Sequence, residues 1–114
     1  MDPGNTNFGI QIRTQGPQST QKTILDCTKI AEEMGFEELY VVDHIAIPPD
    51  DVEGSDGRYL DPLSVLNYLA AQTQEIALCT GVLVLPYRPI LPTAKVVATL
   101  QELSGNRLKL GLGV

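Results

Sequence analysis

Tryptophan is absent from this sequence of 114 residues, histidine occurs once, and basic residues are few. The eight Lys and Arg residues are outnumbered by 14 Asp and Glu residues, which gives a net charge of −6, and they are scattered along the chain. Nucleic-acid binding depends on clustered basic side chains that contact phosphates. The composition therefore argues against a nucleic-acid-binding protein.

A long apolar run is also missing, because no segment approaches the roughly 20 residues that a membrane-spanning helix needs. The first ten residues, MDPGNTNFGI, have neither a basic start nor the apolar stretch of a secretory signal. The two cysteines, Cys27 and Cys79, lie on a predicted helix and a predicted strand without zinc-like spacing. We therefore expect a cytoplasmic protein with two buried, free thiols and no metal site.

What remains is an ordinary globular composition, with 43% hydrophobic and 19% charged residues. Strand-like segments start near residues 8, 38, 76 and 107, so successive starts lie 30, 38 and 31 residues apart. This is the size of a right-handed βαβ unit. The order βαβαβαβ predicts one α/β domain with parallel strands over residues 8–114, after a flexible segment 1–7. It fits half of a (β/α)8 TIM barrel or a doubly wound sheet, but no G-x-G-x-x-G follows the first strand, which disfavours a dinucleotide-binding sheet.

Capping signals set the expected bounds of three helices. The first follows Ser19 or Thr20 and ends at Gly35, the second starts at Asp61–Pro62, and the third lies between Pro92 and Gly105. The side chains predicted to face the core are Ile24, Cys27, Ala31 and Met34 in the first helix and Val96, Val97, Leu100 and Leu103 in the third. The second helix is predicted to continue through Leu63, Leu66, Leu69, Ala70 and Thr73.

Four segments carry a more specific pattern: EEMGFEELYVVDHI, DPLSVLNYLAAQT, IALCTGVLVLPYRPILPTAKVVATL and LSGNRLKLGLGV. In order and spacing they resemble the N-terminal half of the luciferase-like flavin and deazaflavin oxidoreductases, over nearly the whole chain from Phe8. The most specific part is the AK-x-x-ATL helix followed by LSGNRL. Within the family, the sequence is most similar to the branch that uses the deazaflavin coenzyme F420 rather than FMN.

This resemblance implies a (β/α)8 barrel of which residues 8–114 form the N-terminal half. It also implies coenzyme F420, or alternatively FMN, at the C-terminal ends of the strands, with hydride transfer or monooxygenation of a small organic substrate. Phosphate groups in such barrels usually bind after strands seven and eight, which lie beyond these 114 residues. We therefore expect a fragment of an oxidoreductase that is not a competent enzyme by itself. The alternative is a non-catalytic half-barrel, either a pseudoenzyme or an assembly module.

His44 is the only histidine, and it directly follows a predicted strand at the edge where catalytic groups of parallel sheets gather. An imidazole exchanges protons near neutral pH. In the deazaflavin enzymes that the sequence resembles, the histidine of this Asp-His pair lies near the reacting carbon of the ring. His44 is therefore a candidate catalytic residue, and Asp43 a candidate coenzyme-binding residue. The alternative is that both only cap the strand. Pro48 stands where some of these relatives have a catalytic tryptophan, which argues against their alcohol-oxidising chemistry.

Gly81 and Val82 lie inside the most hydrophobic strand, where glycine usually marks a bulge or a close backbone approach. The resemblance implies a cis peptide at this pair, pressed against the coenzyme ring, so both are candidate coenzyme-binding residues; the alternative is a plain bulge. For Arg88 we favour a salt bridge at the barrel rim, and for Arg107 a structural role at the opposite edge. The long loop 45–60 is either a substrate lid or a solvated acidic loop.

A half-barrel leaves the outer edges of its first and fourth strands unpaired. We also expect its inner sheet face to be apolar. Either a homodimer that closes a pseudo-barrel or a separate C-terminal half would cover these surfaces. Light scattering that shows a folded monomer at micromolar concentration would contradict the homodimer.

Overall fold

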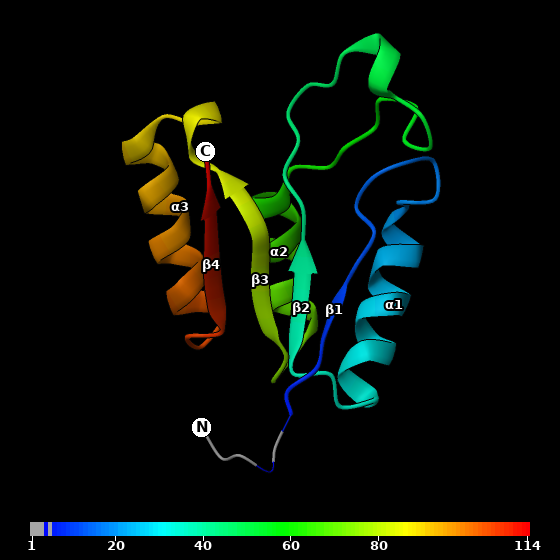
Figure 1. The fold of residues 1–114 in the computed structure, drawn as a ribbon. Helices are drawn as coiled ribbons and strands as arrows, with labels where there is room; N and C mark the ends of the chain where they lie inside the picture. The colour runs from blue at the N-terminus through cyan, green and yellow to red at the C-terminus, as the bar shows by residue number, and fades with distance from the viewer. Residues whose placement is uncertain (1–3, 5) are drawn as a thin grey trace.

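A computed structural model describes residue 4 and residues 6–114; residues 1–3 and 5, within the segment 1–7 predicted to be flexible, lie outside the described residues. Four parallel strands form one sheet in the order β1-β2-β3-β4. Their bounds are β1 (Gly9–Gln11), β2 (Glu38–Val41), β3 (Ala77–Val84) and β4 (Leu108–Gly113). The helices α1 (Gln21–Glu33), α2 (Pro62–Gln72) and α3 (Ile90–Leu103) connect them and cover one face of the sheet (Figure 1). Two short 3-10 helices, η1 (Pro49–Asp51) and η2 (Leu85–Tyr87), lie in the connections. The predicted order and the parallel α/β sheet are confirmed.

The helix ends follow from local signals in the sequence. The Thr20 side chain accepts a hydrogen bond from the N–H of Thr23, and the Asp61 carboxylate accepts one from the N–H of Ser64. Gly35 follows α1 with φ +84°, a conformation that glycine adopts without strain. The third helix begins at Ile90 and not at Pro92. Proline is tolerated inside its first turn because N–H groups there have no intrahelical acceptor.

The core lies between the helices and the outer face of the sheet. Leu39 and Val41 of β2 and Leu78 of β3 are fully buried there, together with side chains of α1 and α2. In α2, Leu63, Leu66, Leu69 and Ala70 lie in the helix as predicted and are buried, whereas Thr73 is its C-cap. In α1, however, Thr28 is buried in place of Cys27, which is an exposed free thiol, and Met34 is 71% exposed. One residue along a helix turns the side chain by about 100°, so Cys27 and Thr28 cannot share the same face.

In α3 only Leu100 is fully buried, whereas four inward-facing residues were predicted. Val97 is half-buried, and both Val96 and Leu103 are exposed. One flank of α3 packs against α2. Its other side lines an apolar groove of about 510 Å³ that also contains Leu110 and Leu112 of β4, so Val97 remains partly accessible.

The inner face of the sheet is not apolar, which corrects the prediction. The side chains there include Glu38 and Tyr40 of β2 and Lys109 of β4, and the ammonium group of Lys109 pairs with the carboxylate of Glu38. Four glycines also lie on this face: Gly9, Gly81, Gly111 and Gly113. Strand residues alternate between the two faces, and the apolar set already faces the helices. The exposed apolar surface is therefore the outer groove, and the homodimer stays a prediction.

Two charged side chains hold the amino-terminal edge of β3. One carboxylate oxygen of Glu32, at the end of α1, accepts the backbone N–H groups of Gln74, Glu75 and Ile76 at 2.9, 2.6 and 3.0 Å. Arg107 donates to the carbonyl oxygens of Ala70, Thr73, Ile76 and Ser104 and to the Thr73 hydroxyl. The structural role predicted for Arg107 is confirmed.

The Glu32 contacts predict a pH dependence of stability. Burial raises the pKa of Glu32, but the three backbone donors and Arg107 lower it more, so its pKa lies below the ordinary value. A carboxyl whose pKa is depressed on folding stabilises the fold above its unfolded pKa, about 4.3, and this contribution is lost as pH falls through the folded value. Glu32→Gln is expected to cost about 1–2 kcal/mol at pH 7 and less at pH 3, measured by urea denaturation. An equal cost at both pH values would contradict this.

Candidate functional site

The four predicted site residues all lie toward the carboxyl ends of two neighbouring strands, β2 and β3. Val41 of β2 pairs with Thr80 of β3, and one carboxylate oxygen of Asp43 accepts the backbone N–H of Val84 at 2.9 Å. Asp43 therefore reaches Val84, just beyond Gly81 and Val82 of β3, and His44 follows Asp43 in the chain. Active sites of parallel α/β proteins occupy this edge.

Asp43 is buried and engaged by an arginine. Arg88 Nη1 donates to Asp43 Oδ2 at 3.1 Å and Nη2 donates to Oδ1 at 3.0 Å, while Nη2 also lies 2.7 Å from Asp61 Oδ1. The Asp43 side chain is fully covered, and the Arg88 side chain is 10% exposed. Burial raises the pKa of Asp61, but the bonds from Ser64 and the charge of Arg88 lower it more. The salt bridge predicted for Arg88 is confirmed, and a contact of Asp43 with a coenzyme stays a prediction.

His44 is exposed, and its ring packs edge-on against Tyr59 from the long loop. The ring centroids are 4.8 Å apart, with an interplanar angle of 64°. The end of this loop is held against the segment after β1, because Leu60 N–H donates to the Thr14 carbonyl and Gly16 N–H donates to the Arg58 carbonyl. Arg58 turns away and donates to Ser19. Tyr59 is therefore a neighbour of the histidine, which we had not predicted.

Gly81 and Val82 form a bulge joined by a cis peptide bond, and both features were expected. Thr80 pairs with Leu110 and Leu83 pairs with Leu112, so two residues of β3 face the single Gly111 of β4. The buried Thr80 hydroxyl bridges this gap, because it donates to the Gly111 carbonyl at 2.8 Å and accepts the Gly111 N–H at 3.0 Å. Sequence reasoning missed this hydroxyl; its only signal is the polar residue beside the glycine in an apolar strand.

These features suit a flat heteroaromatic ring. Gly81 is exposed and has no Cβ, and the Val82 side chain is 42% exposed, so the bulge presents an accessible, mainly apolar surface. His44, which follows the neighbouring strand β2, is able to donate or accept a proton. Within residue 4 and residues 6–114, no cluster of three or more His, Cys, Asp and Glu side chains is placed to hold a metal ion. Over the same residues, no helix is long and apolar enough to cross a membrane.

Known proteins are similar to this chain in sequence and fold. The methylenetetrahydromethanopterin reductase of Methanolobus tindarius is 35% identical over 107 residues, which are 93% of this chain and 28% of that protein. The coenzyme F420-dependent tetrahydromethanopterin reductase of Methanopyrus kandleri superposes with a TM-score of 0.71 at 31% identity, over 94% of this chain and 26% of that one. Monooxygenase RslO1 of Streptomyces bottropensis gives a TM-score of 0.75 at 29% identity, over 95% and 33%.

The chain thus spans a quarter to a third of the length of these proteins. Its four parallel strands and alternating helices correspond to part of their TIM barrel, and the predicted N-terminal half of a (β/α)8 barrel is confirmed. Residues 6–114 match the family described as luciferase-like monooxygenase. This chain belongs to the luciferase-like monooxygenase family.

Proposed function

We propose that this chain is the N-terminal part of a coenzyme F420-dependent oxidoreductase that transfers hydride to or from a small organic substrate. The observation that carries the proposal is that the exposed His44 and the exposed Gly81–Val82 bulge both lie toward the carboxyl ends of the adjacent strands β2 and β3. The 31% identity to the coenzyme F420-dependent reductase of Methanopyrus kandleri supports this coenzyme over FMN.

In this proposal, the deazaflavin supplies a ring carbon that accepts or releases hydride. Gly81 and Val82 hold one face of the ring. His44, oriented by the edge contact with Tyr59, holds or releases a proton at an imidazole nitrogen beside it. Arg88 and Asp43 fix the end of β2 and hence the place from which His44 projects.

Coenzyme titration tests the proposal. Coenzyme F420 and FMN are titrated separately into the chain, with ligand fluorescence as the readout, and coenzyme F420 is expected to bind more tightly. Val82→Asp places a carboxylate against the ring and is expected to weaken binding by at least about tenfold. Ile30→Asp, at an exposed apolar position on α1, is the matched control and is expected to leave binding within about twofold.

Three results would count against parts of the proposal. Tighter binding of FMN than of coenzyme F420 would contradict the choice of coenzyme but not the proposed location of the site. Equal weakening by Val82→Asp and Ile30→Asp would place the ligand elsewhere. A folded chain that binds neither compound would favour the alternative, a non-catalytic half-barrel.

A further inference from the structure

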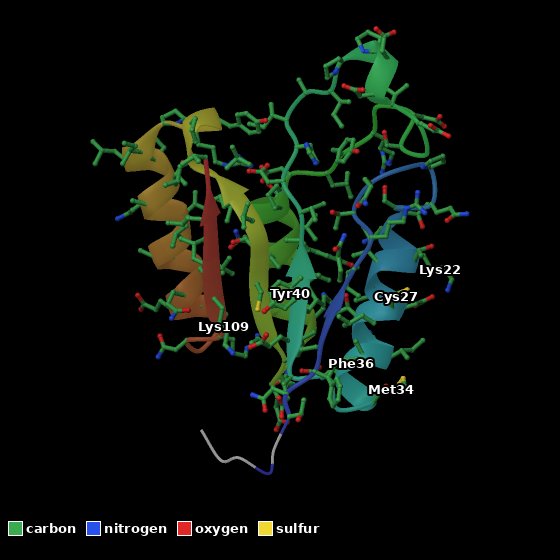
Figure 2. All side chains as sticks on the ribbon, in the orientation of Figure 1. Lys22, Cys27, Met34, Phe36, Tyr40 and Lys109 are labelled. Carbon is green, nitrogen blue, oxygen red and sulfur yellow. The ribbon has the colours of Figure 1, made fainter. Side chains whose placement is uncertain are left out.

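A tyrosine ring lies across the inner face of the sheet, directly beneath the proposed ring site. Tyr40 belongs to β2, on the face away from the helices (Figure 2). A Cβ added to Gly81 of β3 would lie 3.1 Å from Tyr40 Cδ1, and a Cβ added to Gly9 of β1 would lie 2.8 Å from Tyr40 Cε2. The ring therefore lies against two glycine backbones on the strands on either side, at a separation that a side chain at either position would disturb.

The ring is anchored at the end far from the proposed site. The Tyr40 hydroxyl donates to Glu38 Oε2 at 2.6 Å, and the other oxygen of Glu38 pairs with Lys109 of β4. The hydrogen bond from Lys109 lowers the pKa of Glu38 most, and the hydrogen bond from Tyr40 lowers it further. The Glu38 carboxylate therefore stays ionised and able to accept. The bond to Glu38, with a smaller contribution from burial, raises the pKa of Tyr40 to about 12, so the hydroxyl remains a donor at neutral pH.

The direction in which the Tyr40 hydroxyl points determines which part of the side chain is close to the proposed site. Glu38 precedes Tyr40 by two residues on the same strand, so the hydroxyl points toward the amino-terminal edge of the sheet. The proposed coenzyme lies at the carboxyl edge. The hydroxyl therefore does not reach the reacting atoms, and only the aromatic carbons of Tyr40 face the Gly81 backbone.

We infer that Tyr40 is a positioning residue whose ring, fixed by Glu38 and Lys109, supports the Gly81–Val82 segment from below as a flat platform for the coenzyme ring. This inference rests on the proposed function. Gly9 and Gly81 contribute to this support, because the absence of a side chain at either position lets the Tyr40 ring lie close to β1 and β3.

Two tyrosine variants separate the ring from its hydroxyl. Tyr40→Phe keeps the ring and loses the bond to Glu38, whereas Tyr40→Leu removes the flat surface. Tyr40→Phe is expected to bind coenzyme F420 within about twofold of the unmodified chain, and Tyr40→Leu about tenfold more weakly, as for the loss of one aromatic contact. Tyr68→Leu on α2, where the hydroxyl contacts Gln21, is the matched control for a generic loss of tyrosine and is expected to leave binding unchanged.

Proton NMR gives a second readout that does not depend on the coenzyme. The α-protons of Gly9 and Gly81 should show ring-current shifts that Tyr40→Phe keeps and Tyr40→Leu abolishes. Equal coenzyme binding by the unmodified chain and Tyr40→Leu would overturn the role of Tyr40 and leave the proposed function intact. Absence of binding by the unmodified chain, with the ring-current shifts present, would overturn the proposed function and with it the platform.

Discussion

Replacing Arg88 with methionine is expected to lower the free energy of unfolding by about 3–5 kcal/mol, because it leaves a buried carboxylate without its counter-ion. Both carboxylate oxygens of Asp43 are bound by Arg88, and among the described residues the one further hydrogen bond to this carboxylate comes from the Val84 N–H. Methionine fills a similar volume but cannot donate. Urea denaturation followed by circular dichroism measures the effect as a lower midpoint at unchanged slope.

A second arginine provides the control. Arg58 also makes two hydrogen bonds, to the Ser19 hydroxyl and carbonyl, but it is exposed and binds no carboxylate, so Arg58→Met is expected to cost less than about 1 kcal/mol. Arg88→Lys keeps the positive charge but loses the bidentate hydrogen bonding to Asp43. Its loss of unfolding free energy should therefore lie between those of Arg88→Met and Arg58→Met. If Arg88→Met and Arg58→Met unfolded at the same urea concentration, the ion pair would contribute nothing beyond its hydrogen bonds.

The features that the sequence predicted well depend on a few neighbouring residues. The caps at Thr20 and Asp61 act on N–H groups three residues later, and the turn at Gly35 needs only its own backbone freedom. The bulge at Gly81 is signalled in the same way, by glycine within an apolar strand. Such signals hold whatever the rest of the chain packs against.

The features that the sequence missed depend on residues far apart in the chain. Glu32 binds the turn before β3, and the predicted salt bridge of Arg88 has two partners, Asp43 and Asp61, that were not predicted. No local pattern indicates which of 14 acidic side chains meets which base or backbone donor. The faces of α1 and α3 were misjudged for a related reason. Apolar spacing selects a face within about one residue, and only the packed neighbours decide between Cys27 and Thr28.

The candidate site likewise has features that were predictable from the sequence and features that were not. The residue types and the strand ends predicted that Asp43, His44, Gly81 and Val82 lie toward one edge of the sheet, because the carboxyl ends of parallel strands share that edge. The state of each side chain was not predictable. Asp43 is buried in a salt bridge with Arg88, whereas His44 is exposed and packs against Tyr59. Burial and partners come from the loop and from η2, which the strand pattern does not describe.

Gly111→Ala is expected to cost about 1–3 kcal/mol, because the new methyl group has no room. A Cβ at this position would lie 2.3 Å from the carbonyl oxygen of Thr80, which belongs to the backbone of the neighbouring strand and cannot rotate away. Relief requires β3 and β4 to separate at the bulge, which also breaks the two hydrogen bonds between the Thr80 hydroxyl and Gly111. Urea denaturation measures the loss.

Gly113→Ala is the matched control, since it makes the same change two residues later on the same strand and face. There the nearest atom is Val82 Cγ2, at 2.5 Å, and the Val82 side chain is partly exposed and free to rotate. We therefore expect Gly113→Ala to cost less than about 1 kcal/mol. The two variants separate backbone crowding from side-chain crowding beside the Gly81–Val82 bulge. If Gly113→Ala proved the more damaging, the close approach of β4 to the Thr80 carbonyl would not be what requires glycine in this strand.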